Sequence, residues 1–544
     1  MAARGDSVQR QAQWRHGRVV VALMVAVTLA IAGCESSPPG NADATRTEAT
    51  GAATTATTAV EASNGASYDA ASCPNPIVEG VPQIDLGPDF ECGYLTVPEN
   101  RAQPTGRTIQ IPVARAKATS PNPQPDPLVY LTGGPGGTGL AAAVLRVQAG
   151  WNADRDVIFI DQRGTLKAQP LLACPEIDAF LQAAVSLAPT SAEFMARSAA
   201  ATQACHDRLV AADWDLSAYN TTENAADVAD LRVALGIPEW NLYGVSYGTD
   251  LALQILRDHP EGIRSVVLDS VVPPQLNLFD GFWPNAAVGY RALFDACAQD
   301  TACDSAFPDV ESQFQTLVNQ LTAQPRTVRV TDPSTGQDID VVFDGYTLAN
   351  LAVLASLTPG DVSAVPSWVH DLATGDGTQA ATALLDTRPL TGITGYGLAF
   401  GVFCREQVPF TSPEQVRSEA KRALPDFPDA VLALPPQAPT IFQDCRIWNV
   451  PPADPAVQAQ TRSDVPVLLL EGSLDAITPK NWAEAAASGL PNSRILVFPG
   501  AAHDVLLWSP DCAVTIMRNF LNQPNGGYDD RCLGSVTIPP FVTG

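Results

Sequence analysis

Ser246, which lies between two glycines, is the residue with the clearest potential for chemistry in the sequence. It occupies the centre of Gly244–Gly248, a G-x-S-x-G pattern that follows an apolar run and precedes a helical pattern over 249–258. Such glycines leave room for a sharp strand-to-helix turn that holds the serine hydroxyl away from the strand end. The N-terminus of the helix also stabilises negative charge that develops beside this hydroxyl. The pattern therefore predicts a nucleophile for acyl transfer rather than an ordinary serine in a tight turn.

A serine nucleophile needs a base, and the base needs a carboxylate that orients it. Asp475 and His503 each follow a late apolar run, which gives the chain order Ser, Asp, His. Asp504 adjoins the proposed base itself, and Glu471 is too close to its strand end to lie on the loop. The sequence therefore predicts a catalytic triad of Ser246 as nucleophile, His503 as general base and Asp475 as the orienting carboxylate.

A second glycine-rich segment, Leu131–Gly137, follows the apolar run that begins at Leu128. A backbone N–H of Gly133 or Gly134, together with the N–H of Tyr247, would complete an oxyanion hole for the tetrahedral intermediate. A phosphate-binding loop is the alternative, but the segment has neither the Lys-Ser/Thr ending of a P-loop nor the spacing of a dinucleotide fingerprint. We expect an oxyanion hole here.

Short apolar runs alternate with helical patterns, which predicts a mostly parallel central sheet with right-handed crossovers. Residues 108–113 alternate apolar and polar side chains and predict a half-buried strand. The stretch 274–464 interrupts this alternation of strands and helices, because it contains helical segments and a hairpin-like stretch over 327–343. It predicts a large, mainly helical cap domain, inserted between core segments 73–273 and 465–544, over the sheet edge where such folds bind ligands. The other predicted strands are 128–131, 157–160, 240–243, 265–268, 467–470 and 495–498, and the predicted helices are 224–235, 249–258, 481–489 and 512–521.

The N-terminal region has the pattern of an export signal followed by a flexible tether. Arginines precede an apolar run over 19–32 that ends in small residues before Cys34, as in a bacterial lipoprotein signal peptide spanning 1–33. This run is shorter than the ~20 residues that a membrane-spanning helix needs, which disfavours an uncleaved anchor. An ordinary secretory signal with an incidental cysteine is the other alternative. Residues 34–72 hold almost no large apolar side chain and predict a flexible tether, with folded sequence beginning near Cys73. We predict a lipid anchor on Cys34 at the outer face of the bacterial cytoplasmic membrane, or secretion.

Charge and length narrow the possible functions further. The chain has 58 acidic against 32 basic residues and a formal net charge of −26, so nucleic acid is not an expected partner. Its 544 residues exceed what one compact core usually holds, which agrees with a core and an inserted domain.

The chain has eleven cysteines, and assigning Cys34 to lipid leaves ten. An even number in an exported chain predicts disulfides, with sequential pairing as the simplest of the possible connectivities. No cysteines have the C-x-x-C spacing and the histidines are scattered, so we expect neither a metal site nor a cofactor. We read His16 as part of the signal, and His206, His259 and His370 as surface or packing residues. The sequential pairs are Cys73–Cys92, Cys174–Cys205, Cys297–Cys303, Cys404–Cys445 and Cys512–Cys532.

Three glycine-containing segments resemble one known family. Gly133–Gly136 (G-G-P-G), Asp161–Gly164 (D-Q-R-G) and Gly244–Gly248 look like the proline iminopeptidase and tripeptidyl aminopeptidase group of α/β-hydrolases. The resemblance runs from about Cys73 to the end of the chain and implies an α/β-hydrolase fold. The parts similar to the secreted lipoprotein branch of actinobacteria are Tyr219–Thr222, Asp227, Leu231-Arg232, Leu235-Gly236 and the late segment with Asp475 and His503.

One position departs from this family. Iminopeptidases usually place a histidine before G-G-P-G, and this chain has Thr132 there. The departure argues against strict proline specificity and does not affect the predicted triad.

The resemblance implies a serine hydrolase that cleaves peptide bonds near a free N-terminus through an acyl-enzyme on Ser246. We expect it to release one to three residues, because a cap restricts access to short peptides and chain ends. In similar enzymes, carboxylates of the cap often bind the α-amine of the substrate, and Glu406 is the candidate for this role. The alternatives for Glu406 are a solvated acidic side chain or a partner of Arg405. We expect Asp161 and Arg163 to form a structural pair that supports the loops.

Two other functions remain open at this point. A carboxylesterase on the same scaffold would use the same triad, because the fold does not determine the substrate. A non-catalytic lipoprotein that binds peptides for uptake would need neither the triad nor the glycine loop. The expected partners are a peptide or a small ester, together with the membrane through Cys34. The sequence leaves the residue preference and the oligomeric state open.

Overall fold

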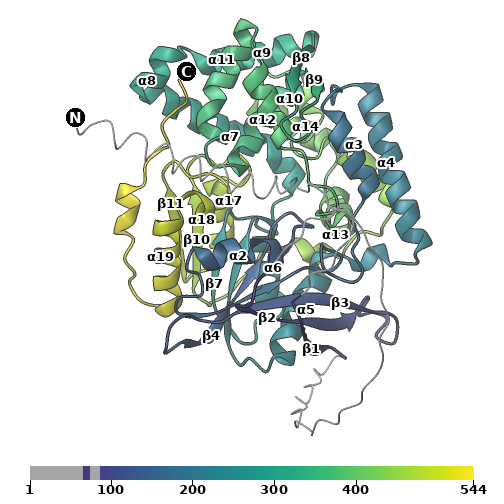
Figure 1. The fold of residues 1–544 in the computed structure, drawn as a ribbon, viewed down its shortest axis with the longest axis vertical. Helices are drawn as coiled ribbons and strands as arrows, with labels where there is room; N and C mark the ends of the chain where they lie inside the picture. The colour runs from purple at the N-terminus through teal and green to yellow at the C-terminus, as the bar shows by residue number, and fades with distance from the viewer. Residues whose placement is uncertain (1–64, 74–85, 544) are drawn as a thin grey trace, which may run out of the picture. The chain divides into compact units, whose positions relative to one another are not determined.

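A nine-stranded sheet forms the core of the folded part of the chain in the computed structural model, which describes residues 65–73 and 86–543 (Figure 1). The predicted signal peptide at 1–33 and the predicted lipidation of Cys34 lie outside these residues. Within the described ranges, no helix has both the length and the apolar character needed to cross a membrane.

The sheet is mostly parallel, as predicted. Its strand order is β1-β2-β3-β5-β4-β6-β7-β10-β11, and the pairs from β5 to β11 all run parallel. The carboxyl ends of these strands therefore meet at one edge of the sheet. The strands are β2 (Phe90–Pro98), β3 (Thr108–Ala116), β4 (Gln124–Leu131), β5 (Arg155–Ile160), β6 (Trp240–Val245), β7 (Ile263–Asp269), β10 (Val467–Gly472) and β11 (Ser493–Phe498), so every predicted strand is confirmed.

The first strand corrects the predicted extent of the tether. Residues 34–72 were expected to be flexible, but β1 (Ser67–Ala71) pairs antiparallel with β2, and Ala66 is buried. A strand at a sheet edge gains its stability from backbone hydrogen bonds to its neighbour, so it does not need the large apolar side chains that the prediction looked for. The ordered part of the chain thus begins before Cys73.

Alternate side chains of the central strands point to opposite faces of the sheet, and each face is covered by helices. Val129 of β4 packs in one core cluster with α5 (Thr221–Ala234), α6 (Tyr247–Asp258) and α17 (Lys480–Ala487). Tyr130 packs in the other cluster with α2 (Gly139–Gln148) and α19 (Pro510–Asn522). The four predicted helices correspond to α5, α6, α17 and α19 and are confirmed within a few residues at their ends.

The segment between β7 and β10 is mainly helical and lies beside the carboxyl edge of the sheet (Figure 1). The predicted hairpin is present as β8 (Arg326–Thr331) and β9 (Asp338–Phe343). Leu474, Ile477 and Ala502, from the loops after β10 and β11, belong to the same apolar core as this segment. The helices are α7 (Leu278–Gln299), α8 (Thr301–Ala306), α9 (Val310–Ala323), α10 (Gly345–Leu354), α11 (Val365–Thr374), α12 (Thr378–Asp386), α13 (Tyr396–Val402), the π-helical η4 (Phe403–Gln407), α14 (Pro413–Ala423), α15 (Asp429–Leu432) and α16 (Ile441–Trp448).

A helical pair from an earlier part of the chain packs against the segment between β7 and β10. We call this segment and the helical pair together the cover. The helices α3 (Pro175–Ala184) and α4 (Ala192–Ala211) lie between β5 and α5 in the chain. The N–H of Val342 in β9 donates to the carbonyl of Val185 at 2.8 Å, and Thr202 of α4 donates to Asp444 of α16 at 2.8 Å. The cover over the sheet edge is thus built from two separate stretches of sequence.

All five predicted disulfides are present: Cys73–Cys92, Cys174–Cys205, Cys297–Cys303, Cys404–Cys445 and Cys512–Cys532. Cys174 and Cys205 also lie near Glu176 in a group that could hold a metal by geometry. Their disulfide removes both thiolates, so this group does not offer a metal site.

The predicted pair of Asp161 and Arg163 is wrong, because the two side chains have separate partners. Asp161 accepts hydrogen bonds from the Thr138 hydroxyl at 2.7 Å and from the N–H of Leu140 at 3.1 Å. Arg163 is fully buried and makes two hydrogen bonds of 2.8 Å to the carboxylate of Asp227 in α5. Both residues nevertheless tie loops at the sheet edge to neighbouring helices, which is the supporting role that was expected.

Candidate active site

Ser246 lies at the turn between β6 and α6, as its glycine-flanked pattern predicts. Its φ of 55° and ψ of −126° place it in a backbone region that few residues other than glycine adopt. A Cβ on Gly244 would lie 2.2 Å from the carbonyl oxygen of Gly248. A Cβ on Gly248 would lie 2.1 Å from that of Leu131 in β4. Only glycine fits at these two positions.

Asp475 and His503 come together on the loops that follow β10 and β11. Nδ1 of His503 lies 2.9 Å from Oδ2 of Asp475, and both side chains are buried. Burial opposes the ionisation of Asp475, but the charge and hydrogen bond of His503 hold the pKa of that carboxyl below its usual value. Burial also opposes the protonation of His503, yet the facing Asp475 carboxylate raises the pKa of the imidazole above its usual value. The pair is therefore arranged to stabilise an imidazolium ion.

Ser246 and His503 line one cavity of about 390 Å³ at the carboxyl edge of the sheet. Gly133, Gly134 and Tyr247, the predicted oxyanion-hole residues, line the same cavity. A Cβ on Gly133 would lie 2.8 Å from Cβ of Ser246, so the glycine loop packs directly against the serine. The rest of the lining is largely apolar and includes Val272, Leu278, Phe282, Leu357, Phe403, Ile477 and Leu507.

Thr478 belongs to this site, although the sequence reasoning missed it. Its hydroxyl donates to Oδ2 of Asp475 at 2.8 Å and lies 3.2 Å from Nδ1 of His503. Its N–H donates to Oδ1 of Asp475 at 3.0 Å. A threonine three residues after a loop aspartate can form both contacts, and this spacing is the signal that could have identified it.

Ser356, in the cover, also holds the two loops and was not found from the sequence. Its carbonyl accepts from the N–H of His503 at 3.0 Å, and its hydroxyl accepts from the N–H of Ala476 at 3.2 Å. This buried residue lies just after α10, more than a hundred positions away along the chain, so no local pattern relates it to the site.

The two rival carboxylates have other partners. Asp504 lines the Ser246 cavity, but one of its oxygens pairs with Arg146 and the other has no hydrogen-bond partner among the described residues. Glu471 is buried and accepts from the N–H of Val271 at 3.1 Å, and burial raises its pKa well above the usual value. Of the three carboxylates that were considered, Asp475 is the one hydrogen-bonded to His503.

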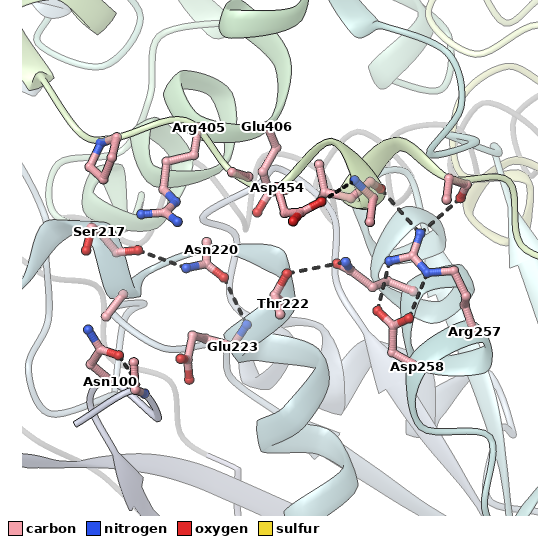
Figure 2. Close-up of a pocket in the computed structure, with 18 residues that line it drawn as sticks. Asn100, Ser217, Asn220, Thr222, Glu223, Arg257, Asp258, Arg405, Glu406 and Asp454 are labelled. Atoms are coloured by element: carbon pink, nitrogen blue, oxygen red, sulfur yellow. Dashed lines mark hydrogen bonds and ion pairs between the residues drawn. The ribbon is translucent and has the colours of Figure 1, made fainter. Parts of the chain in front are cut away.

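Glu406 lies in η4 and lines a second cavity of about 760 Å³ (Figure 2). It accepts hydrogen bonds from the N–H of Thr221 at 2.8 Å and from the hydroxyl of the same residue. Burial raises the pKa of Glu406 to about 7. The Thr221 hydroxyl also lies 3.0 Å from the phenol oxygen of Tyr247, so Glu406 reaches the Ser246 turn through two side chains rather than directly. A role for Glu406 in binding the substrate amine stays a prediction.

The pairing of His503 with Asp475 predicts how the imidazole titrates. We expect a pKa above the unperturbed value of about 6.5, measured from the NMR signals of the ring across a pH series. Asp475→Asn removes the facing negative charge and should lower the pKa of His503. Asp511→Asn, a substitution at the start of α19, serves as the charge control and should leave the titration unchanged. An unaltered pKa in Asp475→Asn would contradict the electrostatic coupling of the pair.

Comparisons with known proteins agree with the fold. Residues 126–349 match the family model described as alpha/beta hydrolase fold, and residues 435–532 match the model described as TAP-like protein. The serine protease Hip1 of Mycobacterium tuberculosis is 24% identical over 466 residues, which cover 81% of this chain and 86% of that protein.

One further relative and one solved structure also match parts of the chain. The tripeptidyl aminopeptidase of Streptomyces lividans is 32% identical over 237 residues, or 41% of each chain. The crystal structure of the proline iminopeptidase of Mycobacterium smegmatis matches with 17% identity and a TM-score of 0.35, over 79% of this chain and 98% of that one. Given the matched family models and the strand order, the chain has the α/β-hydrolase fold, with peptidases among its relatives.

Proposed function

We propose that the protein is an exported aminopeptidase that releases one to three residues from peptide N-termini through an acyl-enzyme on Ser246. The observation that carries this proposal is the buried Asp475–His503 pair, which shares one cavity with Ser246. The peptidase relatives support peptide bonds as the substrate class.

The site residues suit each step of acyl transfer. His503 accepts the proton of Ser246 as the hydroxyl oxygen attacks the scissile carbonyl, and Asp475 holds the tautomer and stabilises the imidazolium. N–H groups of Tyr247 and of Gly133 or Gly134 stabilise the oxyanion. His503 then protonates the leaving amine and later activates the water that hydrolyses the acyl-enzyme.

The cover supports cleavage near a chain end. The cavity beside Ser246 has a volume of about 390 Å³, which suits a few residues rather than a folded chain. Its wall includes Leu278, Phe282 and Phe403, so we expect apolar side chains next to the scissile bond. No cofactor or metal takes part in the proposed reaction.

A carboxylesterase is the second candidate, and one specific observation favours it. Glu406, the predicted amine-binding residue, lines a different cavity from Ser246. The charged side chains that line the Ser246 cavity are His503 and Asp504, and Asp504 is already paired with Arg146. An apolar cavity of this kind also suits the acyl chain of a small ester.

Substrates with a free or blocked amine separate these functions. We expect cleavage of a tripeptide amide with a free N-terminus, little cleavage of its N-acetylated form, and a selective loss on the peptide in Glu406→Gln relative to an aryl ester. Measurements of kcat and KM on all three substrates provide the test. Efficient cleavage of the acetylated peptide, or equal effects of Glu406→Gln on peptide and ester, would contradict the aminopeptidase proposal and favour the carboxylesterase.

Ser246→Ala is the control for both enzymatic proposals. It should abolish turnover and labelling by a fluorophosphonate. A parent protein that takes no label would instead support a non-catalytic peptide-binding lipoprotein.

Thr478 should matter for the rate of the reaction rather than for binding. Thr478→Val removes a hydrogen bond to a charged carboxylate, which is worth about 1.5–3 kcal/mol, so kcat should fall roughly 10- to 100-fold with little change in KM. Thr478→Ser keeps the hydroxyl and should retain most of the rate. A valine variant with parental kcat would show that the backbone N–H donors suffice to hold Asp475.

We further propose that a lipid on Cys34 anchors the protein to the outer face of the cytoplasmic membrane. The support is the sequence: a basic segment, an apolar run and small residues precede Cys34. Cys34→Ser should move the protein from the membrane fraction to the soluble fraction without changing its activity on an aryl ester. Retention in the membrane fraction would favour an uncleaved anchor instead.

A further inference from the structure

The larger of the two cavities lies between helices of the sheet layer and the cover, and none of its lining residues lines the Ser246 cavity. It has a volume of about 760 Å³ and is lined by the N-terminus of α5, the end of α6, the π-helical η4 and residues 451–459 (Figure 2). Such a volume is within the range of small-molecule binding sites. Single-turn π-helical segments such as η4 also occur frequently at functional sites.

Arg405 brings to this cavity a positive charge that has no ion-pair partner among the described residues. Its side chain makes no hydrogen bond or ion pair within the described part of the chain, and its Nε is buried without a partner. Figure 2 shows its guanidinium pointing away from η4 toward Asn220. Arg257, which lines the same cavity, is different because Asp258 binds its guanidinium through two hydrogen bonds of 2.8 Å. Arg405 is thus the cation of this cavity that is free to meet a ligand.

Gln254 points to a ligand that also carries a hydrogen-bond donor. It lines the cavity and is only 2% exposed, yet its side-chain oxygen has no hydrogen-bond partner among the described residues. An unpaired carbonyl oxygen in a buried amide calls for a donor inside the cavity, and the backbone N–H of a peptide is such a donor.

The surrounding carboxylates limit the charge that the ligand can carry. Glu223 lines the cavity but is neutralised by Arg101 at 2.6 Å, whereas Glu406 and Asp454 form no ion pair with any residue that the structure describes. A doubly charged phosphate would be repelled by these groups. A single carboxylate suits the planar fork of a guanidinium and carries only one negative charge.

We propose that this cavity binds the C-terminal carboxylate of a short peptide, with Arg405 as the principal contact. The choice of a peptide rests on the proposed function, because an aminopeptidase produces short peptides with free carboxylates. The cavity is then a second binding site for substrate-like or product-like peptides, separate from the Ser246 cavity.

Isothermal titration calorimetry on the full chain carrying Ser246→Ala tests this proposal. The probe is N-acetyl-trialanine, whose blocked amine removes the group that the proposed aminopeptidase site would recognise. We expect this probe to bind, its C-terminal amide to bind at least 10-fold more weakly, and Arg405→Gln to weaken binding of the acid at least 10-fold. Arg417→Gln removes the same charge from an exposed position on α14 and should leave the affinity unchanged.

Several results would overturn the proposal: equal affinity for the acid and the amide, unchanged binding in Arg405→Gln, or Arg405-dependent binding of inorganic phosphate without binding of the peptide. If Arg405→Gln fails to fold, Arg405→Lys takes its place, because it keeps the charge and loses the planar fork, and it should weaken binding at least 3-fold. Because Ser246→Ala has no turnover and the probe has no free amine, a failure of the aminopeptidase proposal leaves this test intact.

Discussion

The backbone at Ser246 changes from strand to helix at a single residue, and this turn constrains much of what surrounds it. Gly244 and Gly248 must lack side chains because carbonyl oxygens lie where their Cβ atoms would be, and one of these oxygens belongs to Leu131 in β4. The missing side chain at Gly248 therefore lets the turn pack against the end of β4, the strand beside β6 in the sheet. The same adjacency places the glycine loop after β4 against the serine. Helix α6, which begins directly after the turn, is then buried along almost its whole length.

The other side of the site depends on the cover as much as on the sheet. Ser356 holds both the loop of His503 and the loop of Asp475, and Asn285 of α7 donates to the carbonyl of Ile477 at 2.8 Å. The inserted helices thus do more than limit access to the cavity. They hold the backbone that carries the base and its carboxylate, so the insertion and the core have to fold together to form the site.

Local patterns in the sequence were sufficient to predict the strands of the sheet and the three candidate triad residues. The strands are short apolar runs between helical patterns, and Ser246, Asp475 and His503 each follow such a run. These features depend on neighbours in the chain, which a sequence displays directly.

The features that were missed depend on partners far away in the chain. Arg163 pairs with Asp227 rather than with the nearer Asp161, because each side chain reaches a different helix. The α3–α4 pair joins the cover through contacts with β9 and α16, which its own amphipathic pattern does not reveal. The direction of the Glu406 side chain, toward Thr221 and the larger cavity, likewise depends on how η4 meets α5.

Each disulfide joins a cysteine to the next cysteine described along the chain. During synthesis or translocation from the N-terminus, every cysteine therefore meets its correct partner before a competing one emerges, and oxidation can proceed without rearrangement. A free thiol upstream would disturb this order, because Cys34 would meet Cys73 first and shift each later pairing by one position. The proposed lipid on Cys34 would block that thiol, so the anchor would also protect the order of oxidative folding.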